Sequence, residues 1–214
     1  MLVTDVNQIK TIEQLRSVVV TNQAQDDNLA DRLYDHIDEY AQGFIADSPL
    51  VFFATAGCSG HVDVSPKGDA PGFIEVQDKK TLLFPERMGN TDARNLRNIL
   101  ENDQVSLVFV IPRTKDVLRV TGKASITKDP ELLDRMASSG RPAQLCIRID
   151  VQECFFHCSR AFNRSHIWNT DKWPESEKKY MRDQITQRKN MTASDYEKAV
   201  NKILHDLGEA DGAY

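Results

Sequence analysis

Basic and polar residues flank the end of one predicted strand and the start of one predicted helix. Lys67 lies at the end of an alternating strand, and Arg94 lies near the start of a helix for which Asn90 or Thr91 is the expected N-cap. The unpaired N–H groups and dipole of a helix N-terminus attract phosphate, and Gly89 allows close approach to the backbone. Arg94 and Lys67 could add charge-assisted hydrogen bonds. An anion site is therefore favoured, although an ordinary capped helix with solvated arginines explains the same residues.

A second basic cluster follows the last predicted strand. His157, Arg160, Arg164 and His166 fall within ten residues of an acidic protein, and Trp168 comes shortly after them. If a helix begins here, Arg160 and Arg164 share one of its faces and could bind a phosphate. Trp168 could stack on a ring. The plain alternative is a basic surface turn with a core tryptophan.

Motifs for several common chemistries are missing. The chain has no GxGxxG after a first strand, no GxxxxGK[ST], no HExxH and no GxSxG, and no motif pairs two carboxylates as acid and base. Cys154, His157 and Cys158 have a metal-like spacing, but on a strand His157 faces away from the two thiols and a fourth ligand is lacking. We therefore expect reduced thiols and no metal. The catalytic residues stay unknown, and a cofactor is expected to carry any difficult step.

Composition and charge are ordinary. Of 214 residues, 40% are hydrophobic and 28% are charged, as in soluble globular proteins. The net charge of −5 argues against nucleic-acid binding. No apolar run approaches the ~20 residues of a membrane span. The N-terminus lacks the regions of a signal peptide, and the cysteine spacing is not that of a disulfide-rich scaffold. We expect a cytoplasmic protein that binds neither nucleic acid nor membranes.

Strands dominate the middle of the chain. Apolar or alternating runs predict them over residues 50–56, 62–65, 81–84, 105–111, 117–126 and 145–152. Pro66 and Gly68 are expected to end the second strand, and the continuous apolar run 105–111 predicts burial on both faces. Successive antiparallel strands with few helices between them predict a mainly β fold, a barrel with flanking helices.

Helices are expected at both ends and after the third strand. Thr11 and Gln14 have the pattern of a capping box. Apolar residues at spacings of three to four predict a longer helix over residues 29–44, which ends before Pro49. The helix that carries Arg94 is expected to bury Ala93, Leu96, Ile99 and Leu100.

The chain divides into three expected parts. Residues 1–48 form an N-terminal helical segment packed on the barrel, residues 49–170 form the barrel, and residues 171–214 form a helical tail. In the tail, Ser194 and Glu197 resemble a capping box that precedes an apolar stripe. This last helix could pack on the barrel or on a partner subunit.

Six motifs occur in order along the chain: HVDVSPKGDAPGF, TLLFPERMGN, NLRNILEN, SLVFVIP, LRVTGKASI and FFHCSRAFNRSHIW. Together they resemble the pyridoxamine 5′-phosphate oxidase-related family of FMN-binding split barrels, in particular its branch with an S-P-K/R-G-D signature. The resemblance spans about residues 44–168. It implies a split β-barrel of the FMN-binding type, FMN as cofactor, and a homodimer that binds FMN between its subunits.

The resemblance also implies candidate site residues. In the family, basic residues from the second strand and from the helix after the third hold the FMN phosphate, and Lys67 and Arg94 occupy these places. Ser65, Asn90 and Asn95 would hydrogen-bond the phosphate or the ribityl chain. Three more candidates for the phosphate, ribityl chain or flavin edge are Arg160, Arg164 and Trp168. This sequence lacks the Arg-x-x-x-x-Lys pattern of the oxidase proper on the second strand.

The implied function is that of an FMN-dependent oxidoreductase. Hydride would pass through the flavin N5 to or from a small-molecule substrate, while the protein supplies orientation and phosphate anchoring. Three alternatives remain open. The first is a non-catalytic module that senses or stores flavin, the second is a split barrel that uses a deazaflavin or haem, and the third is an interaction domain without a cofactor.

Overall fold

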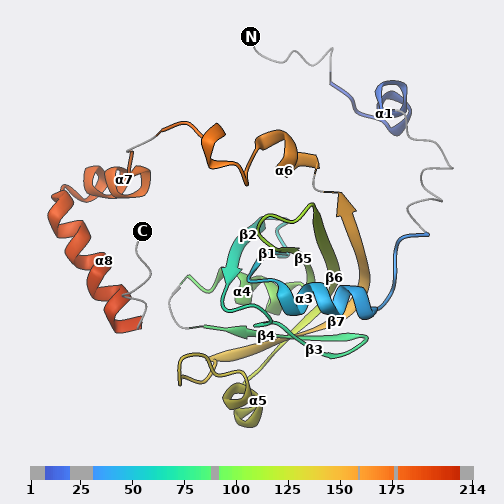
Figure 1. The fold of residues 1–214 in the computed structure, drawn as a ribbon, viewed down its shortest axis with the longest axis horizontal. Helices are drawn as coiled ribbons and strands as arrows, with labels where there is room; N and C mark the ends of the chain where they lie inside the picture. Colours follow the sequence, from blue (N-terminus) through green and yellow to red (C-terminus); the bar gives the residue numbers. More distant parts are fainter. Residues whose placement is uncertain (1–7, 20–30, 88–91, 159, 176–177, 208–214) are drawn as a thin grey trace.

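The sheet is the framework of the molecule. The structure, a computed structural model, describes residues 8–19, 31–87, 92–158, 160–175 and 178–207. Its seven strands pair antiparallel in the order β2-β1-β5-β6-β7-β4-β3, and the sheet curves around α3 (Figure 1). The strands are β1 Leu50–Ala56, β2 Val62–Gly68, β3 Glu75–Asp78, β4 Thr81–Glu86, β5 Gln104–Val110, β6 Asp116–Thr127 and β7 Leu145–Cys158. The expected mainly β fold with flanking helices is confirmed.

Helices lie around the sheet and at both ends of the chain (Figure 1). They are α1 Ile12–Val18, α3 Glu39–Asp47, α4 Arg94–Glu101, α5 Pro130–Arg135, α6 Arg160–Ser165, the 3-10 helix η2 Thr170–Lys172, α7 Tyr180–Lys189 and α8 Ala193–Leu207. Of these, α4 packs on β1 and β6, and α3 packs on β3, β6 and β7. Two helices, α3 and α4, therefore pack against the sheet. Of these, α4 also forms hydrogen bonds with polar side chains of β2.

The hydrophobic core lies between the inward face of the sheet and α3. Phe53 of β1 and Phe84 of β4 are both fully buried, with ring centroids 5.2 Å apart in an edge-to-face contact. Ala41 and Ile45 of α3 are buried against the same cluster. Burial of this apolar face is the main stabilising contribution to the fold.

The helix predicted over residues 29–44 is shorter than expected. Residues 20–30 lie outside the described part, and α3 begins only at Glu39, where the Asp38 carboxylate accepts a hydrogen bond from the Ala41 N–H at 2.8 Å. Before the cap, Tyr34 forms an isolated bridge with Cys154 of β7. Apolar residues occur at helical spacing before the cap as well, because residues of this extended segment also pack on the sheet.

The N-terminal helix α1 confirms the capping box. The Thr11 hydroxyl accepts from the Gln14 N–H at 3.2 Å, and the Gln14 side chain accepts from the Thr11 N–H at 3.2 Å. No residue of α1 is buried. Packing of residues 1–48 as one unit on the barrel therefore stays a prediction.

Two expectations for the strands are wrong. Pairing of β2 continues through Pro66 and Gly68, which lie opposite Phe52 and Leu50. Proline is tolerated here because β2 is an edge strand of the sheet. In β5, burial alternates over most of the strand, so the expected burial on both faces does not hold within one chain, where Val108 stays half-buried.

The tail contains a helical hairpin in which α7 and α8 pack against each other. The expected capping box is displaced by two residues, because α8 begins at Ala193. Thr192, rather than Ser194, accepts a hydrogen bond from the Asp195 N–H at 3.1 Å, and its hydroxyl contacts the Asp195 carboxylate at 2.7 Å. The tail as a separate part of the chain remains a prediction.

A bulge in β7 interrupts its pairing with β6. The register shifts between Thr121 and Gly122, so that Gln152 of β7 has no opposite residue. At this point the backbone of β7 approaches so closely that a Cβ on Gly122 would collide with the carbonyl oxygen of Asp150. Only glycine, which has no Cβ atom, therefore fits at this position.

We predict that Gly122→Ala destabilises the protein. The methyl group would force apart the backbones of two central strands, and overpacking of this kind costs about 1–3 kcal/mol or more. Urea unfolding would measure the loss. Gly43→Ala is the matched control, because a Cβ at Gly43 meets nothing within 4 Å. Equal stability of the two variants would contradict the steric argument.

Candidate functional site

The strand β2 turns its polar side chains inward. Asp63, Ser65 and Lys67 are half-buried, whereas Val62 and Val64 are 71% and 58% exposed. Side chains alternate along a strand, so one face of β2 is polar and contacts α4 and β4. The candidate site is built on this polar face.

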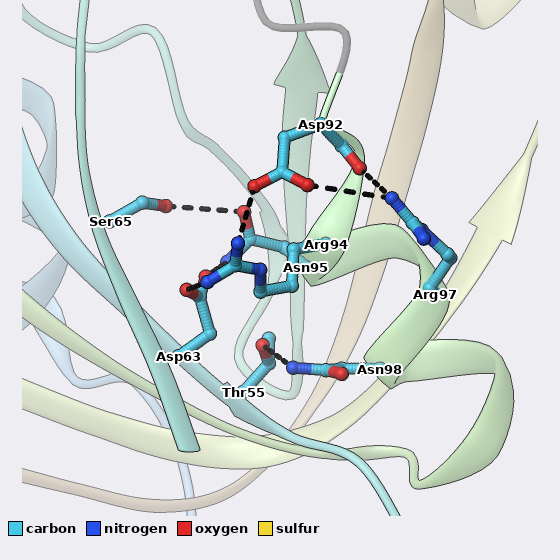
Figure 2. A network of polar contacts seen from close by, with 8 residues as sticks. All are labelled: Thr55, Asp63, Ser65, Asp92, Arg94, Asn95, Arg97 and Asn98. Atoms are coloured by element: carbon cyan, nitrogen blue, oxygen red, sulfur yellow. Dashed lines mark hydrogen bonds and ion pairs between the residues drawn. The ribbon is translucent and has the colours of Figure 1, made fainter. Parts of the chain in front are cut away.

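The side-chain amide of Asn95 joins β2 to α4. Ser65 Oγ donates to Asn95 Oδ1 at 3.2 Å, and Asn95 Nδ2 donates to Asp63 Oδ2 at 3.0 Å (Figure 2). Asn95 is 5% exposed, whereas Leu100, which was expected to be buried, is 78% exposed. The predicted apolar stripe is therefore wrong in part. The helix can bury an amide because the polar face of β2 supplies its partners.

A second contact from α4 to the sheet lies one turn further along the helix. Asn98 Nδ2 donates to Thr55 Oγ1 of β1 at 2.9 Å (Figure 2). Thr55 is 2% exposed, so this hydroxyl has been taken out of water and needs a partner. Together, Asn95 and Asn98 fix the position of α4 against β1 and β2.

Arg94 is already paired with carboxylates. Its guanidinium contacts Asp92 Oδ2 at 3.0 Å and Asp63 Oδ1 at 3.5 Å, and the side chain is 61% exposed (Figure 2). Arg97 also contacts Asp92. Arg94 is therefore linked through Asp63 to the contact between Ser65 and Asn95, but its charge is offset by two acids.

The start of α4 differs from the prediction. The helix begins at Arg94, and its N-cap is Ala93, which has a left-handed backbone with φ of 49° and makes no side-chain cap. Neither Asn90 nor Thr91 is therefore the cap of the helix described here. Both residues lie outside the described part of the chain, and so does the predicted contact of Asn90 with a ligand.

Lys67 forms a bidentate ion pair with Glu86 at the end of β4. The Nζ atom donates to the two carboxylate oxygens at 2.7 and 3.0 Å. The side chains are only 17% and 12% exposed. Because water is largely excluded, the Coulomb attraction within this pair is stronger than in a surface salt bridge, and removing one partner would leave a poorly solvated charge.

A second ion pair lies beside it. Arg87 Nε donates to Asp69 Oδ2 at 2.9 Å, and the Arg87 guanidinium also donates to the Met136 carbonyl. Ser138 Oγ donates to the other Asp69 oxygen at 3.2 Å. Sequence reasoning missed Glu86, Arg87 and Asp69 as site residues, because their partners lie 18 or more positions away.

These residues surround a cavity of about 230 Å³. Ser65 and Lys67 contribute from β2, Phe84 and Glu86 from β4, and Arg87 follows β4. The remaining lining residues are Pro66, Gly68, Phe73 and Pro85. The cavity thus offers a hydroxyl, an ammonium group and a guanidinium group beside an aromatic wall. These donors suit a phosphate ester or a polyol chain.

The basic cluster after β7 is not part of this cavity. Arg160 and Arg164 share the short helix α6 and are exposed. Trp168 packs edge-to-face on Phe162, with centroids 5.7 Å apart. The Nε1 atom of Trp168 is buried and has no hydrogen-bond acceptor in the described structure. Three of the predicted ligand contacts are therefore not brought to β2 within one chain.

The cysteines do not converge. Cys154 is buried, and burial together with the nearby Asp38 carboxylate raises the pKa of its thiol to about 12. Cys158 is exposed at the end of β7. Among the described residues, no group of three His, Cys, Asp or Glu side chains is placed to hold a metal ion. Within the same residues, no helix has the length and apolar character needed to cross a membrane.

We predict that Asn95→Ala lowers the free energy of unfolding by about 1–3 kcal/mol, because Asp63 and Ser65 lose a buried hydrogen-bond partner. Chemical denaturation would measure this. Arg94→Ala removes an exposed ion-paired residue next in the chain and should cost less than about 1 kcal/mol. An Asn95→Ala protein as stable as Arg94→Ala would show that the amide does not hold α4 to β2.

Comparisons with solved structures give distant likenesses. HupZ from Group A Streptococcus is 20% identical, with 57% of this chain and 95% of HupZ covered at a TM-score of 0.48. An FMN-binding protein from Syntrophomonas wolfei is 15% identical, with 68% and 95% covered at 0.44. HutZ, a heme storage protein from Vibrio cholerae, is 15% identical, with 57% and 94% covered at 0.39.

A family model, rather than these distant structures, shows which family the chain belongs to. No curated protein matches the chain. The family model described as pyridoxamine 5′-phosphate oxidase matches residues 37–158, which is more than half of the chain. The matched region begins before α3 and ends with β7. It therefore contains the whole sheet and the cavity on β2, and the chain belongs to the pyridoxamine 5′-phosphate oxidase family of split β-barrels.

Proposed function

We propose that this protein binds FMN, with the phosphate and ribityl chain at the cavity on the polar face of β2. The observation that carries the proposal is the cavity itself, in which Lys67 and Arg87 offer N–H donors and Ser65 offers an acceptor oxygen beside the Phe84 ring. Membership of the family supports FMN as the ligand. Arg94 and Asn95 lie next to Ser65 and add to the phosphate end of the site.

The proposed activity is oxidation or reduction of a small molecule. FMN, when bound, supplies hydride chemistry at its N5 atom. The chain's own part is to hold the phosphate with Lys67, to orient the ribityl hydroxyls with Ser65, and to keep water from one side of the ligand with Phe73 and Phe84. A catalytic acid or base stays unassigned.

Haem and deazaflavin are the alternative cofactors. HutZ is described as a heme storage protein, which keeps haem in consideration. Haem iron needs an axial ligand, usually His, Cys, Met or Tyr. None of these types occurs among the described residues that line the cavity, and this favours a flavin. A deazaflavin would use the same phosphate donors, and its absorbance would distinguish it from FMN.

The test is the absorbance of the purified protein and the identity of any released chromophore. We expect a flavin spectrum, and FMN in the supernatant after heating. The Lys67→Ala/Arg94→Ala variant should lose at least about 90% of the bound flavin, because two charge-assisted contacts to the phosphate are removed. Titration of the stripped protein with FMN would give the change in Kd.

The matched control is Lys123→Ala/Arg135→Ala, which removes two ion-paired surface cations outside the cavity. It should retain flavin at normal stoichiometry. Full flavin content in the Lys67→Ala/Arg94→Ala variant would remove the assignment of the phosphate site. If flavin is tightly bound but NADH and NADPH do not reduce it, a sensing or storage module replaces the oxidoreductase.

A homodimer is the second part of the proposal. The outer face of β2 and β1 exposes Val62, Val64 and Phe52 at 71%, 58% and 37%. Contiguous exposed apolar surface of this kind is typical of an interaction site. The cavity of about 230 Å³ is also smaller than pockets that enclose a drug-sized ligand, which hold roughly 300–1,000 Å³. A second copy could complete it, and Arg160, Arg164 and Trp168 remain candidates for that role.

We predict that Val62→Lys/Val64→Lys makes the protein monomeric and weakens flavin retention, because charges would be buried between two apolar faces. Light scattering after size exclusion would measure the mass. Tyr40→Lys/Leu100→Lys is the control, since these residues are 71% and 78% exposed on helices away from this face. A wild-type protein that is monomeric with FMN bound would contradict the dimer.

We also propose that the protein is located in the cytoplasm. All four cysteines are free, two of them buried. Free thiols suit a reducing compartment. Fractionation of the native cells would test it.

A further inference from the structure

The cavity on β2 contains a carboxylate at the point where a phosphate is expected. Glu86 is 9% exposed and lines the cavity together with Lys67. Its two oxygens accept from the Lys67 ammonium group at 2.7 and 3.0 Å. Lysine has three N–H donors. Two of them are therefore directed to an anion that belongs to the protein itself.

The neighbouring cation is compensated in the same way. Arg87 is held by Asp69 at 2.9 Å, so each of the two described cations that line the cavity has its own carboxylate. A phosphate dianion that enters meets no net positive charge among these four residues. It must compete with Glu86 for Lys67, and it is repelled by Glu86 while that contact lasts.

We propose that Glu86 is an internal counter-ion that competes with the ligand's phosphate for Lys67, and so determines how strongly the site prefers phosphorylated over unphosphorylated ligands. The inference rests on the proposed function of the cavity and adds a residue that limits affinity. In the free protein Glu86 neutralises Lys67. In the bound protein the ammonium group turns partly from Glu86 to the phosphate.

Glu86 affects phosphate binding through its negative charge rather than through its size. Glu86 is the last residue of β4, where it pairs with Leu145, and its backbone carbonyl accepts a hydrogen bond from the Gln144 N–H at 3.0 Å. Glu86→Gln keeps the backbone, the side-chain length and one acceptor oxygen for Lys67, and it removes only the negative charge. Riboflavin, which lacks the phosphate, carries no charge that would respond to this change.

The experiment compares the binding of FMN and riboflavin to the stripped full-length protein by flavin fluorescence. We expect Glu86→Gln to bind FMN about tenfold more tightly than the wild type, since a nearby repulsive charge is removed. Riboflavin affinity should stay within about twofold of the wild type. The gain for FMN should disappear in Lys67→Met/Glu86→Gln, because no ammonium group is then released. Circular dichroism and thermal unfolding would verify that each variant is folded.

The matched control is Glu75→Gln, which removes the carboxylate of the exposed Glu75–Arg135 pair outside the cavity and should change neither affinity. Unchanged or weaker FMN binding by Glu86→Gln would overturn the counter-ion role while leaving FMN binding intact. An equal gain for riboflavin would also overturn it, because the effect would not depend on phosphate. If neither the wild type nor Glu86→Gln binds FMN, the proposed function falls together with this inference.

Discussion

Alternation of side chains along one edge strand determines how this protein is organised. In β2, the residues at odd positions from Asp63 to Lys67 face α4 and β4, while Val62 and Val64 face outward. The proposed ligand cavity and the proposed subunit interface therefore lie on opposite sides of the same short strand. A shift of β2 by one residue relative to β1 would exchange the two faces and destroy both. This coupling explains why the polar contacts of Asn95 matter beyond their own energy, since they hold the inward face in place.

Much of the sheet could be predicted from the sequence, because strand periodicity is a local signal. The runs that became β1, β6 and β7 were correctly identified. Expectations failed where a tertiary contact overrode a local pattern. The apolar repeat before Glu39 belongs partly to an extended segment bridged to β7, and Pro66 remains in a strand because its missing N–H faces no partner at the sheet edge.

The site was harder to predict than the fold. Four of the predicted site residues lie on or beside β2, namely Ser65, Lys67, Arg94 and Asn95. The two cations among them, Lys67 and Arg94, are paired with carboxylates and are not free for a phosphate. The reason is that Glu86 meets Lys67 and Asp63 meets Arg94 from distant positions, and no local spacing shows which acid will meet which base. Arg160, Arg164 and Trp168 were predicted as ligand contacts from their local charge and spacing, and one chain does not bring them to the cavity.

The close approach at Gly122 also limits how β6 and β7 can align. β6 and β7 contain 12 and 14 residues, and the segment that connects them contains α5. Burial alternates along much of both strands, so a shift of the register by two residues would keep the same faces buried. Only an alignment that brings glycine to the Asp150 carbonyl allows the two backbones to meet at the bulge. The single hydrogen of the Gly122 side chain thus selects one register among those that would bury the same apolar faces.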